Sequence, residues 1–286
     1  MRGEQTREGV LAQPEWLRAV PTDVRLPDGA RVLYTGCGTS YHAAQTGGEA
    51  VQALELLVAP RQADILVVVS HEGTTPLTLE AARAFRGERW LVTAKEDSPL
   101  GELCERVIVA TPAVEKSWCH TAAYTCAVAT LAAMRGDDVS SFPGAVEQAL
   151  TEEPRVTDHE RWLVAGAGAD WPTAQEAVLK LREGAFVAAE AHETEQLLHG
   201  YLAAVDERVR CFVLAGEGRA AQRADDAVAA LRELGCDVEL VPTVHPVVDI
   251  VPFQLLTLAL ADARGVDPDR IRRDDDRWAR ARATYD

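Results

Sequence analysis

The chain has little positive charge and no long apolar run. Of its 286 residues, 29 are Lys or Arg and 45 are Asp or Glu, which gives a formal net charge of −16 at pH 7 with His neutral. This charge opposes binding to nucleic-acid phosphates and to anionic lipid. No stretch approaches the roughly 18–20 consecutive apolar residues of a membrane span, and no signal-peptide core follows Met1. We therefore expect a cytoplasmic protein that binds neither nucleic acid nor membrane.

Cysteine pairs and metal-ligand spacings are also absent from the sequence. The six cysteines form no CxxC motif, and a chain of this length needs no disulfide framework, so we expect reduced thiols. His192 and Glu193 could begin an HExxH motif, but Gln196 stands where the second His belongs, so no zinc site is expected. The sequence predicts no cofactor. An apolar content of 47% is sufficient for a hydrophobic core.

Two parts of the chain resemble each other at an offset of 130 residues. Residues 31–44 read RVLYTGCGTSYHAA and residues 161–174 read RWLVAGAGADWPTA. In both, a short apolar run meets GxG and then a helix-permissive stretch, the pattern of a buried strand, a tight turn and a crossover helix. Further on, DILVVVSHEG (64–73) and VRCFVLAGEG (209–218) repeat a strand and an EG turn.

The alternation of strand and helix predicts an α/β fold with two tandem doubly wound parallel-sheet domains of flavodoxin-like type. The clearest expected helices span 77–85, 171–189 and 220–234. The clearest expected strands span 53–59 (ALELLVA), 90–93 and 237–241. Gly, Pro and acidic residues gather near 136–158 and predict a boundary there. The expected division is an N-terminal segment 1–29, a first domain 30–145, a second domain 146–264 and a C-terminal tail 265–286.

Hydroxyl side chains follow the strands of the first copy. Open parallel sheets bind ligands at the carboxyl ends of their strands, and short hydroxyls there donate hydrogen bonds to small polyoxygenated or anionic ligands. In the second copy, Ala169 and Asp170 stand at the positions of Thr39 and Ser40. The sequence therefore predicts the ligand site in the first half. The alternative is that these hydroxyls only cap the following helices.

A dinucleotide site is the main competing interpretation, because GCGTSY (36–41) follows an expected strand and opens an expected helix. The third Gly of GxGxxG is missing, and no acidic residue ends the ALELLVA segment. Both are parts of the dinucleotide fingerprint, so we do not expect a nucleotide cofactor.

Taken together, several motifs resemble the sugar isomerase (SIS) domain family, especially the tandem isomerase module of glucosamine-6-phosphate synthase and related aldose–ketose isomerases. The motifs are CGTSYHAA (37–44), SHEGTTPLTLEAAR (70–83), EKSWCHTAAYT (115–125), EAVLKLREGAFVAAEA (176–191) and ETEQLLHG (193–200). The resemblance covers residues 30–265. It implies two five-stranded parallel sheets and a homodimer with a shared active site.

The resemblance also implies roles for individual residues. Glu183, which ends LRE where the family has LKE, is implied as the general base. His199 of the LLHG motif is implied to open the sugar ring, within its own subunit or across a dimer. Glu195 is expected to reach sugar hydroxyls. The expected substrate-binding residues of the first half are Cys37, Gly38, Thr39, Ser40, Ser70, His71, Glu72, Thr74 and Thr75.

The sequence departs from the family pattern in three ways. Glu72 replaces the second Ser of the SxSGxT phosphate loop, where it would repel a phosphate by about 1–4 kcal/mol. Either Glu72 turns away, His71 neutralises it by pairing, or the ligand is not a simple phosphate monoester. No Lys follows Lys180, so an imine-forming lysine is not expected. No glutaminase domain precedes residue 30, so ammonia transfer from glutamine is not expected.

Aldose–ketose isomerisation moves a proton between adjacent carbons through an enediolate, and one carboxylate can carry that proton. Glu183 lies beside the apolar face of the expected 171–189 helix, which predicts partial burial. The alternative is a surface Glu that only pairs with Lys180. We expect a cofactor-free isomerase, or a related deglycase or deaminase, for a sugar or sugar phosphate, possibly an amino sugar. The second hypothesis is an inactive sugar-phosphate sensor.

Overall fold

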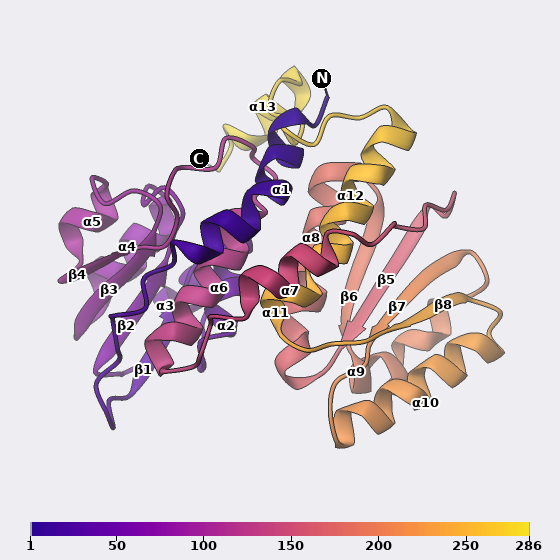
Figure 1. Ribbon diagram of the computed structural model, residues 1–286, viewed down its shortest axis with the longest axis horizontal. Helices are drawn as coiled ribbons and strands as arrows, with labels where there is room; N and C mark the ends of the chain where they lie inside the picture. The colour runs from indigo at the N-terminus through magenta and orange to yellow at the C-terminus, as the bar shows by residue number, and fades with distance from the viewer. Residues whose placement is uncertain (1, 286) are drawn as a thin grey trace. The chain divides into compact units, whose positions relative to one another are not determined.

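The computed structural model describes residues 2–285 and divides them into two compact units (Figure 1). The first unit contains residues 4–148 and 269–285, and the second contains residues 2–3 and 149–268. Each unit is built around its own parallel four-stranded sheet. The α/β class with parallel sheets is therefore confirmed.

The strands of the first unit are β1 (Val32–Thr35), β2 (Ile65–Val69), β3 (Glu88–Thr93) and β4 (Arg106–Val109), and they pair in that order. Its helices are α1 (Glu4–Arg18), α2 (Thr39–Gln45), α3 (Ala53–Val58), α4 (Pro76–Ala84), α5 (Pro99–Leu103), α6 (Ala122–Arg135), α7 (Phe142–Ala149) and α13 (Asp276–Arg282). An isolated parallel bridge joins Tyr34 to Ala50 beside β1. The sheet thus has four strands and one bridge where the resemblance implied five strands.

Helices cover both faces of the first sheet, as a parallel sheet requires. All five residues of β2 are buried, which explains its unbroken apolar sequence ILVVV. One face packs against α3, α4 and α5 through a core that includes Leu33, Leu66 and Leu91. The helices α2 and α6 contact each other and the sheet.

The strands of the second unit are β5 (Arg161–Gly166), β6 (Ala188–Glu193), β7 (Val209–Leu214) and β8 (Asp237–Val241), in the order β6-β5-β7-β8. Its helices are η1 (Gly168–Asp170), α8 (Trp171–Ala185), α9 (Thr194–His199), η2 (Tyr201–Ala204), α10 (Arg219–Glu233), α11 (Pro246–Asp249) and α12 (Val251–Arg264). The first strand of each unit has a neighbour on both sides. The strand β1 lies between the bridge at Ala50 and β2, and β5 lies between β6 and β7.

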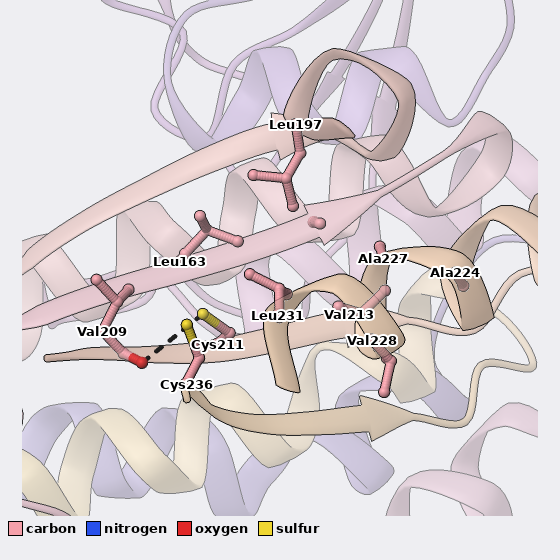
Figure 2. Packing of buried hydrophobic residues seen from close by; sticks show 11 residues of the cluster. Leu163, Leu197, Val209, Cys211, Val213, Ala224, Ala227, Val228, Leu231 and Cys236 are labelled. Carbon is pink, nitrogen blue, oxygen red and sulfur yellow. Dashed lines mark hydrogen bonds between the residues drawn. The ribbon is translucent and has the colours of Figure 1, made fainter. Parts of the chain in front are cut away.

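The core of the second unit is apolar on the side of α9 and α10. Figure 2 shows Leu163 of β5 and Val213 of β7 facing Leu197 of α9 and Leu231 of α10. These four side chains are at most 2% exposed. Their burial fixes α9 and α10 against the sheet, and with them the loops at its carboxyl edge.

Two expected elements are wrong. The 171–189 helix ends at Ala185, because Phe186 takes a left-handed conformation (φ 55°), and Ala188 and Ala189 belong to edge strand β6. The ALELLVA segment forms α3 and not a strand, since the Gln52 side chain accepts hydrogen bonds from the first-turn N–H groups of that helix. Short apolar runs are ambiguous between helix and strand, and these local signals decide.

One helical stretch, Pro246–Arg264, is long and apolar enough to cross a membrane by length and composition alone. It contains α11 and α12, and 61% of its most apolar window is buried inside the protein. The helix α12 packs against α8 in the second unit. Buried core helices pass the same test of length and composition, so this stretch does not by itself indicate a membrane span.

Candidate functional site

A pocket opens at the carboxyl ends of β2, β3 and β4 in the first unit. It holds about 330 Å³ of space, counting the part open to solvent. Hydroxyls and two imidazoles line it above an apolar floor. The lining residues are Thr39, Ser40, Ala43, Val69, His71, Val92, Thr93, Ala110, Thr111, His120, Ala123, Tyr124 and Ala127.

Glycines place the first two hydroxyls in the pocket wall. A Cβ at Gly36 would lie 2.8 Å from the backbone of Ser40, so only Gly lets β1 turn directly into α2. Gly38 then takes a positive φ of 55° and ends the turn, a conformation that Gly adopts without strain. The GCG motif therefore sets Thr39 and Ser40 at the carboxyl end of β1, as the sequence predicted.

His71 is held in the pocket wall as a neutral imidazole. Its Nε2 accepts a hydrogen bond from the Glu115 N–H at 2.9 Å, and its ring centre lies 4.7 Å from that of His120. Its carbonyl accepts from Thr93 Oγ1 at 2.9 Å. Burial lowers the pKa of His71 to about 4. A neutral imidazole does not offset the charge of a carboxylate, which argues against the alternative in which His71 neutralises Glu72.

A buried carboxylate organises the loop that carries His120 and leads into α6. Glu115 Oε1 accepts from the backbone N–H of Thr121 at 2.8 Å and from its hydroxyl at 2.7 Å. Glu115 Oε2 accepts from the Ala123 N–H at 2.8 Å. The side chain is 4% exposed, so these charge-assisted bonds are shielded from water. They fix the backbone on both sides of His120.

Three of the predicted binding residues of the first half line the pocket, namely Thr39, Ser40 and His71. The others lie outside its wall: Cys37, Gly38, Ser70, Glu72, Thr74 and Thr75. Cys37 Sγ is 3.5 Å from Thr78 Oγ1. Ser70 is buried, and its backbone N–H donates to the Val92 carbonyl. Within residues 2–285, Thr75 makes no side-chain capping bond at the start of α4. The helix-capping alternative therefore fails for Thr75.

Sequence reasoning missed four polar lining residues: Thr93, Thr111, His120 and Tyr124. His120 and Tyr124 belong to EKSWCHTAAYT, which was noted for its resemblance without a role for its members. Thr93 ends β3, and Thr111 follows β4 by two residues. The rule that ligands bind at strand ends, applied to all four strands, could have found both threonines.

In the second unit, Glu183 belongs to a buried ionic cluster on α8. Lys180 Nζ donates to Glu183 Oε2 at 2.7 Å and lies 3.4 Å from Glu176 Oε1. The side chains of Lys180 and Glu176 are 1% exposed and that of Glu183 is 23% exposed. Glu183 is thus partly buried, and its partner is a buried ammonium and not a surface one.

The other two predicted residues of the second half lie on α9 and are exposed. His199 is the last residue of the helix, before Gly200. Glu195 Oε2 accepts from Arg223 Nε of α10 at 2.8 Å. Among residues 2–285, no group of three or more His, Cys, Asp or Glu side chains is arranged to hold a metal ion.

At the carboxyl edge of the second sheet, the Asp170 side chain accepts a hydrogen bond from the protein itself. Asp170 Oδ2 accepts from Thr243 Oγ1 at 3.2 Å, and Thr243 Oγ1 accepts from the Gly216 N–H at 3.2 Å. Asp170 is 6% exposed, and burial raises its pKa. It stands 130 residues after Ser40, at the equivalent position in the repeat.

A second acid lies close to Asp170. Asp249, 5% exposed, accepts from the Val244 N–H through Oδ1 at 2.9 Å, and its Oδ2 has no hydrogen-bond partner among the described residues. Burial and, to a smaller extent, the charge of Asp170 raise the pKa of Asp249 to about 6, although backbone N–H donors act in the opposite direction. No periodic pattern in the sequence predicts this pair, because Asp170 ends η1 and Asp249 ends α11, far apart along the chain.

Comparison with known proteins connects part of the second unit to a known family. The SIS domain model matches residues 156–259. Glutamine–fructose-6-phosphate aminotransferase (isomerizing) of Methanothermobacter thermautotrophicus is 24% identical over 90% of this chain and 52% of its own length. The chain thus spans about half the length of that relative.

Two solved structures share the fold. The C-terminal domain of glucosamine-fructose-6-phosphate aminotransferase from Francisella tularensis has a TM-score of 0.77 at 19% identity, over 93% of this chain and 98% of that one. Glucosamine-6-phosphate deaminase from Thermotoga maritima has a TM-score of 0.74 at 19% identity, over 93% and 97%. The resemblance seen in the motifs is confirmed by the SIS domain model, which matches residues 156–259 of this chain.

Proposed function

We propose that the chain is a cofactor-free isomerase, or a related deglycase or deaminase, acting on a sugar phosphate or amino-sugar phosphate. The observation that carries this proposal is the pocket at the carboxyl ends of the first sheet, which is lined by Thr39, Ser40, Thr93 and Thr111. The hydroxyls of Thr93 and Thr111 donate to protein carbonyls, so their oxygen atoms serve a ligand as acceptors. Such hydroxyls match a ligand with many oxygen atoms. The names of the relatives, all of which include a hexose phosphate, support the same substrate class.

Glu183 is the proposed general base. The cluster of Glu176, Lys180 and Glu183 holds two carboxylates and one ammonium, so its formal charge is −1 when all three are ionised. The Lys180 ammonium, 2.7 Å from Glu183 Oε2, favours the ionised form of Glu183, and a general base must be ionised before it can take a proton from a sugar carbon. His199 is proposed to open the sugar ring, and Glu195 to contact sugar hydroxyls.

The proposed reaction needs Glu183 and the pocket to meet around one substrate. We propose that the two units are copies of one ancestral SIS domain, since they share the 130-residue repeat and since β1 and β5 each lie between the segment that follows them and a later strand. We also propose that a homodimer completes the active site. The proposed SIS domains are 30–145 and 146–264; of the expected end segments 1–29 and 265–286, residues 4–29 and 269–285 belong to the first compact unit. A cytoplasmic location also belongs to this proposal.

Solvent exchange tests the catalytic part. In D₂O, the protein should incorporate deuterium at the carbon next to the carbonyl of fructose 6-phosphate or glucosamine 6-phosphate, measured by proton NMR. Glu183→Gln should lower the exchange rate about a hundredfold or more, the usual contribution of a general base. Glu233→Gln, a surface control on α10, should leave it unchanged. Binding of both sugars without exchange in the wild type would overturn the catalytic proposal.

A sugar-phosphate sensor is the second candidate. It is favoured by Glu183 itself, whose Oε2 is already occupied by the Lys180 ammonium. A sensor would bind the same sugars, with equal affinity in the wild type and in Glu183→Gln, and would show no exchange in either.

A further inference from the structure

The C-terminal segment 269–285 belongs to the first unit and contributes a buried carboxylate to the start of α1. Asp269, 6% exposed, accepts from the Thr6 N–H and hydroxyl through Oδ1, both at 2.7 Å. Its Oδ2 accepts from the Gln5 N–H at 3.1 Å. First-turn N–H groups lack partners within a helix, and a negative charge is favourable there. Asp269 thus caps α1 from the far end of the chain.

The same residue also holds the loop that leads to His120. The Asp269 carbonyl accepts from the Trp118 N–H at 3.0 Å. Thr6 Oγ1 lies 2.7 Å from Ser117 Oγ, which in turn accepts from the Cys119 N–H at 3.1 Å. Residues 117–119 are therefore tied both to the C-terminal segment and to α1.

A cation from the C-terminal segment adds a third tie. The guanidinium carbon of Arg273 lies 3.6 Å from the centre of the Trp118 ring. A cation over the face of an indole ring is attracted to the ring electrons, more strongly where water is excluded. The segment thus holds Trp118 through its backbone and through its side chain.

Helix α1 reaches the other end of the loop through Gly9. A Cβ at Gly9 would overlap Glu115 Oε1 and lie 2.8 Å from Thr121 Oγ1. These two atoms cannot simply move aside, because they hydrogen-bond each other and Oε1 also binds the Thr121 N–H. The position of α1, which Asp269 fixes, therefore affects Glu115 before His120 and Thr121 after it.

We propose that Asp269 is a positioning residue for the pocket of the first unit. Through Trp118 and α1 it holds residues 117–121 in the one arrangement that places His120 beside His71 in the pocket wall. The C-terminal segment is then part of the ligand site without contacting the ligand. The proposal rests on the proposed function only in taking this pocket as the place where a sugar phosphate binds.

The test compares Asp269→Asn with Asp276→Asn, an exposed aspartate of the same segment. The first readout needs no ligand: the imidazole carbon–proton resonance of His120, assigned with His120→Gln, should shift in Asp269→Asn and not in Asp276→Asn. The second readout is calorimetric binding of fructose 6-phosphate, which should weaken about threefold or more in Asp269→Asn alone. The free energy of unfolding of each variant is measured as well, so that both readouts are taken at a temperature at which every variant is folded.

Gly9→Ala provides a second variant at the other end of the loop, and Gly144→Ala, with open space at its Cβ, is its control. Gly9→Ala should reproduce the His120 shift and the weaker binding even if Asp269→Asn fails to fold. An unchanged His120 resonance in both folded variants would overturn the proposal, and so would a shifted resonance with full affinity. A shifted resonance in a protein whose wild type binds neither fructose 6-phosphate nor glucosamine 6-phosphate would instead overturn the proposed function.

Discussion

The two sheets end in the same way along the chain but differ in what their carboxyl edges hold. In the first unit, Thr39 and Ser40 follow β1 and line an open pocket. In the second unit, Asp170 occupies the position of Ser40 in the repeat, and its carboxylate bonds Thr243. The difference between Ser40 and Asp170 therefore distinguishes the two edges. A ligand oxygen has room at the edge of the first sheet, whereas the Asp170 carboxylate already occupies the edge of the second.

The comparison extends to the interior of the two units. Around the pocket of the first unit, the buried polar groups are hydroxyls, a neutral imidazole and one carboxylate bound by three donors. The second unit buries ions on α8 and a pair of acids at the sheet edge. Buried ions are costly to leave unpaired, so the second unit should be the more sensitive to loss of a charge.

Lys180→Met gives the largest expected effect on this difference. It removes the only ammonium of the cluster on α8 and leaves the Glu176 carboxylate, 1% exposed, without its cation. Breaking a buried pair in this way costs about 3–5 kcal/mol in the free energy of unfolding, measured by urea denaturation. Lys116→Met breaks the exposed pair with Glu8 and should cost less than about 1 kcal/mol. Equal losses in the two variants would contradict the contrast between the units.

Asp249→Asn should give a smaller effect that depends on pH. The folded-state pKa of Asp249, about 6, lies above its unfolded value, so the folded protein holds this proton more tightly. Its stabilising contribution is therefore complete below about pH 4 and is lost as pH rises through about 6. Asn cannot ionise, so the variant should gain up to about 3 kcal/mol at pH 8 and nothing near pH 4. Thermal or urea unfolding at both pH values measures this, and a gain that is the same at both would refute it.

The fold was predictable where the sequence has a strong period. The strand expected at 237–241 has the bounds of β8, and the helix expected at 220–234 differs from α10 by one residue at each end. The errors lie where a single residue decides: Phe186 stops α8 by turning left-handed, and the Gln52 side chain starts α3. Phe is not a typical helix-ending residue and Gln is not a typical helix-starting one, so the sequence does not predict either boundary.

The candidate site was only partly predictable. Thr39, Ser40 and His71 come from turns that directly follow strands, which the sequence pattern locates. His120 reaches the pocket because Glu115 and Asp269 fix its loop, and the partners of Asp269 lie more than 100 residues away in the sequence. A single sequence has no period or spacing that records such contacts.

The central claim is that the open edge of the first sheet is the ligand site, and exchange of the residue that distinguishes the two edges tests it. Ser40→Asp gives the first edge the carboxylate of the second, and Ala169→Asp places a carboxylate at the neighbouring exposed position of the second edge as a control. Calorimetric titration with fructose 6-phosphate should show binding weakened at least about tenfold in Ser40→Asp, through charge repulsion and lost space, and unchanged in Ala169→Asp. Unchanged binding in Ser40→Asp, or an equal loss in Ala169→Asp, would contradict the account.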